Sequence, residues 1–150
     1  MSINDVAISV FFGLCVPTVS DGRLEQTFSP ERVVPLTDED RELYDLGKWE
    51  AWKIQTDIGF VAFEPRDGWC RVLTCEGDPK EALQLFRRQI ADLRGWEEGI
   101  EMQGDGYERV NAMIPLCDGF SVAALLVAEI ENPDAGFVAS AILVRGTENG

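Results

Sequence analysis

The stretch of residues 78–96 constrains the fold more than any other part of this chain, because it is typical of one amphipathic helix with its own start and stop signals. Asp78 is a suitable N-cap, since its carboxylate can accept hydrogen bonds from the first free backbone N–H groups. Pro79 falls at the first helical position, and Glu81 takes the capping-box position. Gly95 is expected to end the helix in a left-handed conformation.

The apolar residues of this helix recur at helical spacing and predict one buried face. The large apolar residues that share this face are Leu83, Phe86, Ile90 and Leu93. Burying a side chain of this size is worth about 1.5–3 kcal/mol, so we expect this face to anchor the core.

Seven segments with strand character lie before and after the main helix, and turn signals separate them. Three precede the helix and four follow it: residues 49–56, 60–64, 69–75, 99–103, 107–114, 120–131 and 137–145. Residues 65–68 read as a four-residue turn between the second and third segments. Turns this closely spaced predict that neighbouring strands run antiparallel.

Two further helices are expected before the first strand. Residues 4–16 are almost entirely apolar, which predicts a helix buried on most sides, with a central strand as the alternative, and Pro17 should end it. Residues 37–47 begin with Thr37 as N-cap, carry acids in the first turn and end at Gly47. The prediction is one α+β domain, residues 1–150, with an antiparallel sheet of about six or seven strands and one main helix packed on it, in the order α, α, βββ, α, ββββ.

The last two strand segments carry few polar residues. Residues 120–131 and 137–145 are rich in Val, Leu, Ile and Ala, a composition typical of central strands that are covered on both faces. Their small residues, which suggest that another element packs close over them, are Ala123, Ala124, Ala139 and Ala141.

Charge and the absence of histidine exclude several classes of function. The chain has 13 Lys and Arg against 27 Asp and Glu, a formal net charge of −14, which disfavours nucleic-acid and anionic membrane partners. It has no histidine, which removes Ser/His and Cys/His nucleophilic pairs and imidazole metal ligands. The acids of residues 38–40 suit a helix start, with a metal site as the alternative. The sequence therefore identifies no catalytic residue, no cofactor site and no metal site.

Four cysteines are present, Cys15, Cys70, Cys75 and Cys117, and no two have the C-x-x-C spacing of a redox or zinc motif. Three states stay open. Free, buried cysteines would act as small hydrophobic residues. A disulfide between Cys15 and Cys70 would join the first helix to the sheet in an oxidising compartment. A zinc site would need all four sulfur atoms together.

The four tryptophans, Trp49, Trp52, Trp69 and Trp96, fall around the first strands and the end of the main helix. Core and edge packing explains most of them, whereas those exposed on one face would form a patch for a partner. Trp49 and Trp52 are separated by an odd number of residues, so on a strand they face opposite sides.

Several of these residues together resemble a pattern in small, uncharacterised proteobacterial proteins that are often exported. The matching features cover about the first two thirds of the chain: Cys15 in an apolar first helix, Tyr44, the segment GKWEAW at 47–52, the segment GWCRV at 68–72, Asp78, and a helix with Phe86. This chain departs from the pattern because no basic signal sequence precedes its first helix. The resemblance implies a bacterial origin and favours a Cys15–Cys70 link, and it implies no activity.

The sequence favours a non-catalytic module that binds an unidentified protein partner, as an adaptor or inhibitor does, through a surface bearing Trp49, Trp52, Trp69 and Trp96. One alternative is a small-ligand sensor, which a buried void of several hundred Å³ would favour. The other is an enzyme based on carboxylates or cysteine, which an acid with a raised pKa beside a second acid would favour. We expect a monomer or homodimer in the cytoplasm, or in the periplasm if a signal segment has been removed, with no nucleic-acid or membrane partner.

Overall fold

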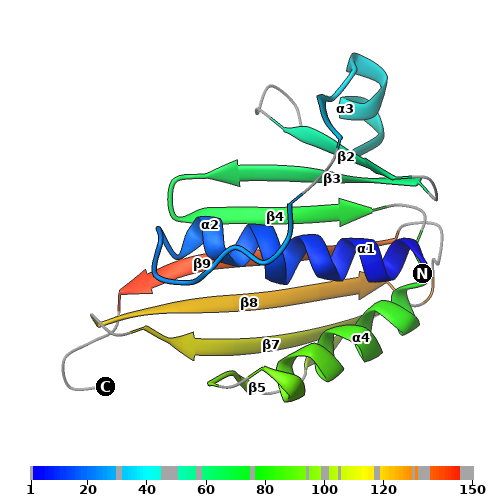
Figure 1. Ribbon diagram of the computed structural model, residues 1–150. Coiled ribbons are helices and arrows are strands. Elements are labelled where there is room, and N and C mark those ends of the chain that lie inside the picture. The colour runs from blue at the N-terminus through cyan, green and yellow to red at the C-terminus, as the bar shows by residue number, and fades with distance from the viewer. Residues whose placement is uncertain are drawn as a thin grey trace.

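The fold is one antiparallel sheet with helices packed on one of its faces (Figure 1). It is taken from a computed structural model. The residues it describes are 2–29, 32–44, 51–56, 59–74, 77–93, 95–98, 102–104, 106–116, 119–129, 131 and 136–145. The α+β class predicted from the sequence is confirmed, with the main helix between two groups of strands.

The helical segments lie mostly in the first half of the chain. They are α1 (Ile3–Val10), the π-helical η1 (Phe11–Cys15), α2 (Val16–Val19), α3 (Asp38–Tyr44) and the main helix α4 (Pro79–Asp92). The strands are β1 (Val33–Pro35), β2 (Trp52–Thr56), β3 (Gly59–Arg66), β4 (Trp69–Thr74), β5 (Glu97–Glu98), β6 (Met102–Gly104), β7 (Tyr107–Pro115), β8 (Phe120–Glu129) and β9 (Phe137–Arg145). In the described ranges no helix is long and apolar enough to cross a bilayer.

The described part of the sheet has nine strands in the order β1-β2-β3-β4-β9-β8-β7-β5, with β6 also paired to β7. β9 returns to pair with β4, which joins the two groups of strands into one continuous sheet. β3 and β4 pair up to Arg66 opposite Trp69, so their turn has two residues. The four-residue turn predicted at residues 65–68 is therefore wrong, and Pro65 lies inside β3.

The first helix starts at a capping box and runs beyond Pro17, which the sequence predicted would end it. The backbone N–H of Ser2 donates to the Asp5 carboxylate (2.8 Å). Pro17 has no N–H for the carbonyl four residues earlier, which is that of Gly13. That carbonyl instead accepts from the backbone N–H groups of Thr27 (2.9 Å) and Phe28 (3.0 Å). The π-helical turn and this loop together let the helix continue for one more turn.

Helix α4 begins as predicted and ends earlier than predicted. Asp78 accepts from the backbone N–H of Lys80 (3.1 Å). The helical face of Leu83, Phe86 and Ile90 is buried, as expected. The chain turns extended at Leu93, which leaves that side chain 36% exposed instead of in the core. Glu81 accepts from the hydroxyl of Ser2 (2.9 Å) and thereby ties α4 to the start of α1.

The main core lies between the helices and the sheet, and aromatic rings fill it. Phe11 and Phe12 pack on Phe86 with ring centroids 5.8 Å and 5.2 Å away. Three of the four alanines named above, Ala124, Ala139 and Ala141, are buried under this layer. Figure 1 shows α1, α2 and α4 on the same side of the sheet. The expectation that β8 and β9 are covered on both faces is therefore wrong for the described residues.

A smaller apolar cluster covers one corner of the opposite face. It consists of Leu36, Ala51, Ala62 and Leu73, with Val138 packed against it. The adjacent helix α3 starts at Thr37, whose hydroxyl accepts from the backbone N–H of Asp40 (3.2 Å), as predicted. The predicted helix end at Gly47 lies outside the described residues.

Candidate functional site

The candidate site is the face of the sheet opposite α1, α2 and α4, which we call the open face. Directly paired residues of neighbouring strands lie on the same face, and alternate residues of each strand share that face. Val72, Ala139, Leu126 and Val110 are successive partners on the helix side, and all are buried. Three residues further along each strand, Trp69, Ile142, Ala123 and Met113 are successive partners on the open face. Ile142 is 45% and Met113 46% exposed.

The two central strands give the open face an apolar band. Its members, which we call the apolar band, are Ala123, Leu125 and Val127 of β8 and Val138, Ile142 and Val144 of β9. Ser140 of β9 is a polar residue among them. A groove of about 610 Å³ lies over the band and the neighbouring β7. Residues in its walls include Arg109, Asn111, Met113, Leu125, Ser140 and Ile142.

One flank of the band, on β3 and β4, carries an ion cluster built around Glu64. Its carboxylate is completely buried although it belongs to the open face, and it accepts from Arg66 (2.6 Å) and from the Nε–H of Arg71. Both guanidinium groups also lie over the ring of Trp69, at 4.6 Å and 5.3 Å from its centroid. Hydrogen bonds and cation–π contacts therefore hold Trp69 and the two arginines in place beside Ile142.

The other flank, on β7, carries Arg109. Its guanidinium lies over the ring of Tyr107, 4.9 Å from the centroid. Its Nε atom is buried and has no hydrogen-bond partner among the described residues. Arg109 also lines the groove, so its guanidinium group lies at the edge of the apolar band.

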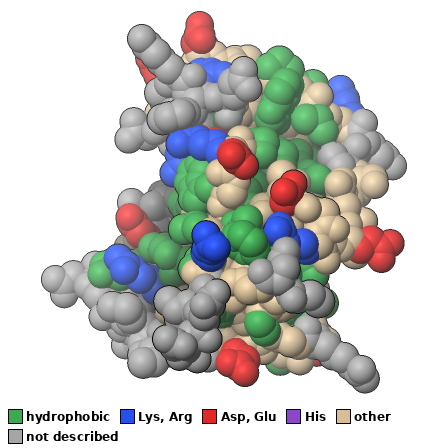
Figure 2. Space-filling model, turned by 90° about the vertical axis from the view of Figure 1, so that its left-hand side faces the viewer, with side chains coloured by type: hydrophobic (Ala, Val, Ile, Leu, Met, Phe, Trp, Pro, Cys, Tyr) green, Lys and Arg blue, Asp and Glu red, His purple; other side chains and the backbone are tan. Residues whose placement is uncertain are grey.

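The open face differs in charge from the rest of the molecule. By strand register its described residues include four basic side chains, Lys53, Arg66, Arg71 and Arg109, and three acidic ones, Glu64, Glu97 and Glu129. The whole chain carries a formal charge of −14. Figure 2 views the strands end-on and shows basic and acidic side chains beside hydrophobic ones in the middle of that surface. The described part of the open face is therefore less acidic than the chain as a whole.

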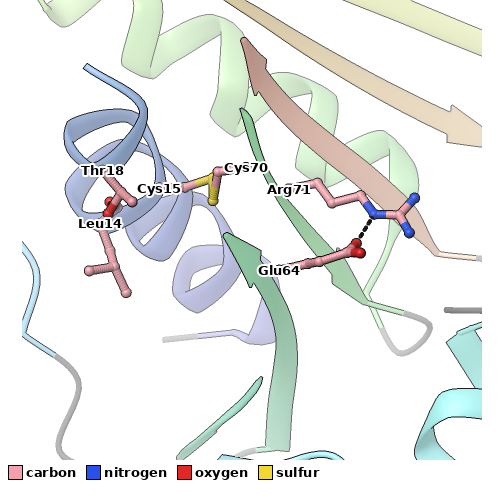
Figure 3. The surroundings of a disulfide bond; sticks show 6 residues. All are labelled: Leu14, Cys15, Thr18, Glu64, Cys70 and Arg71. Carbon is pink, nitrogen blue, oxygen red and sulfur yellow. Dashed lines mark hydrogen bonds and ion pairs between the residues drawn. A yellow bond between two sulfur atoms is a disulfide. The ribbon is translucent and has the colours of Figure 1, made fainter. Parts of the chain in front are cut away.

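The structure joins Cys15 of η1 to Cys70 of β4 in a disulfide, with the two Cα atoms 5.7 Å apart. Figure 3 shows that Cys70 points to the helix and that the next residue, Arg71, points the other way, toward Glu64. The bond fastens the helix layer directly behind the ion cluster. Cys75 and Cys117 lie outside the described residues, and the described residues hold no group of three potential metal ligands among His, Cys, Asp and Glu.

The structure does not bring the described tryptophans together on one surface. Trp69 is half-buried on the open face. Trp52 pairs with Phe63 and so shares the helix side at the far end of the sheet. Trp96 packs edge-on against Phe12, 5.7 Å between centroids, also on the helix side. Trp49 lies outside the described residues.

The helix side offers less space than the open face. A cavity of about 200 Å³ lies between the N-terminal helix, α4 and the loop that follows α2. Phe12, Leu24, Leu93, Trp96 and Ile114 are among its lining residues. Its volume is below the range of about 300–1,000 Å³ that is typical of small-molecule sites.

Two carboxyl groups have pKa values below their ordinary value. The hydrogen bond from the Ser2 backbone N–H lowers the pKa of Asp5, and the hydrogen bond from Lys53 (2.8 Å) lowers that of Asp40. Both are stabilised in the charged form, the opposite of what an acid that donates a proton near neutral pH needs.

Comparison with protein-family models, curated proteins and solved structures found no match to this chain.

Proposed function

We propose that this protein is a non-catalytic binding module that holds a protein partner on the open face of its sheet. One observation carries the proposal: the central strands β8 and β9 expose an apolar band where a covering layer would be expected. Contiguous exposed apolar surface with a polar rim is typical of interaction sites. The partner would supply the layer that this chain provides only on the opposite face.

The energetic gain from such a contact lies mainly in three side chains. Ile142, Met113 and Val144 are each between 37% and 46% exposed. Complete burial of a side chain of this size is worth about 1.5–3 kcal/mol, so covering the exposed part of each gives roughly half of that. The three together would bring several kcal/mol to a complex.

Trp69 and its arginines suit the role of an anchor at the edge of the band. Tryptophan and arginine are enriched among the residues that dominate binding energy at interfaces. Arg66 and Arg71 are fixed by Glu64 and by contact with the Trp69 ring. Side chains that are already ordered lose less conformational entropy when a partner binds.

The disulfide supports the periplasm, or another oxidising compartment, over the cytoplasm as the place of action. Structural disulfides persist in oxidising compartments and are rare in the cytosol. A binding module that acts there gains stability from the Cys15–Cys70 bond without any further subunit or metal.

Site-specific photo-crosslinking tests the proposal. A photoreactive amino acid is placed at position 142, in the band, and in a control protein at position 33, where Val33 is equally exposed on the distant strand β1. We expect a discrete adduct with one partner from position 142 only. The identified partner is then purified, and Ile142→Asp should weaken its binding by roughly tenfold or more, as loss of an interface anchor does, whereas Val33→Asp should not. Equal binding by Ile142→Asp and wild type would overturn the proposal.

A further inference from the structure

We infer that the partner element that covers the apolar band is an amphipathic helix of about 13 residues with acidic side chains along its flanks. This inference rests on the proposed function and specifies its partner. It follows from the backbone pairing of β8 and β9, from the dimensions of the band and from the charges on its two sides.

Backbone pairing decides between a strand and a helix. β8 is hydrogen-bonded to β7 and β9, and β9 to β8 and β4, so neither central strand has a free edge. A peptide that binds by strand addition needs an exposed sheet edge. A helix satisfies its own backbone hydrogen bonds and presents only side chains, so it can lie on a sheet face. On the opposite face of the same strands, α2 and α4 already do so.

The length of the band sets the length of the helix. From Val138 to Val144 the chain of β9 advances six residues, which is about 20 Å at about 3.3 Å per residue. A helix rises about 1.5 Å per residue, so about 13 residues cover this distance. Side chains at positions i, i+3, i+4 and i+7 of that helix would meet the band, as in other helix-in-groove complexes.

The width of the band suits one helix. Arg71 on β4 and Arg109 on β7 are separated by three strand intervals, or about 14 Å at about 4.8 Å each. A helix with its side chains is about 10–12 Å across. It therefore fits between the two arginines, and each arginine faces one of its flanks.

The charges beside the band select the flanking residues of the helix. Arg71 projects from one side and Arg109, whose Nε has no hydrogen-bond partner among the described residues, from the other. Carboxylates of the partner can pair with both guanidinium groups. Glu97 lies beside Met113 at the end of the groove, so the partner residue opposite Glu97 is neutral or basic.

The net charge of −14 does not prevent an acidic helix from binding here. At physiological ionic strength the screening length is about 8 Å, so acids on remote surfaces contribute little at the band. Charges within a few ångströms of the contact decide the preference, and beside the band the three arginines Arg66, Arg71 and Arg109 outnumber the acids Glu64 and Glu97.

Two synthetic helical peptides test this inference by isothermal titration calorimetry. Both have about 14 residues and the same leucines at the i, i+3, i+4 and i+7 spacing. They carry either Glu or Lys at the flanking positions that face Arg71 and Arg109, and Gln opposite Glu97. We expect the Glu peptide to bind the wild-type protein roughly tenfold more tightly than the Lys peptide, since like charges across an interface are strongly unfavourable. Arg109→Gln should reduce this preference. Arg88→Gln, an exposed position on α4, is the matched control and should leave it unchanged.

The outcomes separate this inference from the proposed function. Equal affinity for the two peptides, or tighter binding of the Lys peptide, overturns the acidic helix. A crosslinked partner that attaches at position 142 through an extended segment overturns the helix and leaves the binding module in place. Sedimentation that detects a dimer abolished by Ile142→Asp also overturns it, because a second copy would then occupy the band. Loss of binding of the Glu peptide in the Ile142→Asp variant supports both the acidic helix and the proposed binding function.

Discussion

Cys70 and Arg71 are adjacent residues of β4 whose side chains serve opposite faces of the sheet. Cys70 is bonded to Cys15 in the helix layer, and Arg71 donates to Glu64 on the open face. β4 therefore links the disulfide of the helix layer to the ion cluster beside the proposed binding surface. Substitutions on the two sides should therefore have separable effects. Loss of the disulfide acts on the unfolded chain, whereas loss of the contact between Arg71 and Glu64 acts on the open face of the folded protein.

Removal of the disulfide by Cys15→Ala with Cys70→Ala should lower the free energy of unfolding. The bond closes a loop with a sequence separation of 55 residues. In the chain-entropy account a loop of that size is worth about 4 kcal/mol, within a usual range of about 2–5 kcal/mol. Urea unfolding of the variant and of the wild type measures the difference. A variant as stable as the wild type, or a digest without a Cys15–Cys70 crosslinked peptide, would contradict the assignment.

Substitution of Glu64 by Gln should destabilise the protein and loosen Trp69. Hydrogen bonds to charged groups contribute about 1.5–3 kcal/mol, and the lower end applies because Arg66 and Arg71 are partly exposed. Chemical denaturation gives the stability. In a background where Trp69 is the only tryptophan, a red shift of the emission reports that its ring becomes more exposed. Glu129→Gln, exposed on the same face, is the control and should change stability by less than about 0.5 kcal/mol. Equal effects of the two substitutions on stability would contradict the stabilising role of the ion cluster.

Substitution of Asp5 by Asn should reduce stability at neutral pH and have little effect in acid. The Ser2 hydrogen bonds lower the pKa of Asp5 in the folded state, so its carboxylate stabilises the fold above the unfolded pKa of about 3.9. That contribution is lost as the pH falls through the lower folded value. A charge at a helix N-terminus is worth about 0.3–1 kcal/mol. Urea unfolding between pH 7 and pH 3 should show the two proteins converging, and a constant difference would argue against the titration.

Substitution of Gly13 by Ala should destabilise the protein, although alanine favours helices. A Cβ atom at this position would lie 2.6 Å from the Cβ of Phe28 and 2.9 Å from the Oγ1 of Thr27. Forced overpacking of this kind costs about 1–3 kcal/mol, more than the roughly 1 kcal/mol of helix propensity gained. Thermal unfolding measures the net effect. Ser9→Ala, exposed on the same helix, is the control, and a Gly13→Ala protein more stable than wild type would refute the contact with the loop.

The features predicted correctly from the sequence depend on neighbours along the chain. The start of α4 at Asp78 and of α3 at Thr37 depends on capping groups two or three residues away. The alternation of the strands and the turns between them is equally local. Leu83, Phe86 and Ile90 follow from helical periodicity once the helix is accepted.

The features predicted wrongly depend on contacts between distant residues. The helix passes Pro17 because a loop at Thr27 and Phe28 satisfies the Gly13 carbonyl, which no local pattern indicates. The sequence does not indicate the ion cluster, because the four-residue turn that it predicts sets a different register between β3 and β4. With the four-residue turn Glu64 would pair with Trp69, whereas the two-residue turn pairs it with Arg71.

The apolar composition of β8 and β9 carries a signal for the open face as well as for the core. Apolar residues on both faces of a central strand indicate that both faces are covered, and one chain supplies cover for only one of them here. The side chains that remain exposed, such as Ile142 and Val144, are those a partner would bury. A sequence alone does not show whether the layer that covers a strand belongs to the same chain or to another protein.

Hydroxyl-radical footprinting of Met113 and Ile142 tests the central claim most directly. In the free protein at a concentration where it is monomeric, both side chains should be labelled rapidly relative to the buried residues Leu126 and Val110. Addition of the Glu-flanked helical peptide should then protect Met113 and Ile142 while exposed Val33 stays unchanged. Protection of Met113 and Ile142 already in the free monomer, or labelling that is unaffected by bound peptide, would contradict the claim that this face is the binding surface.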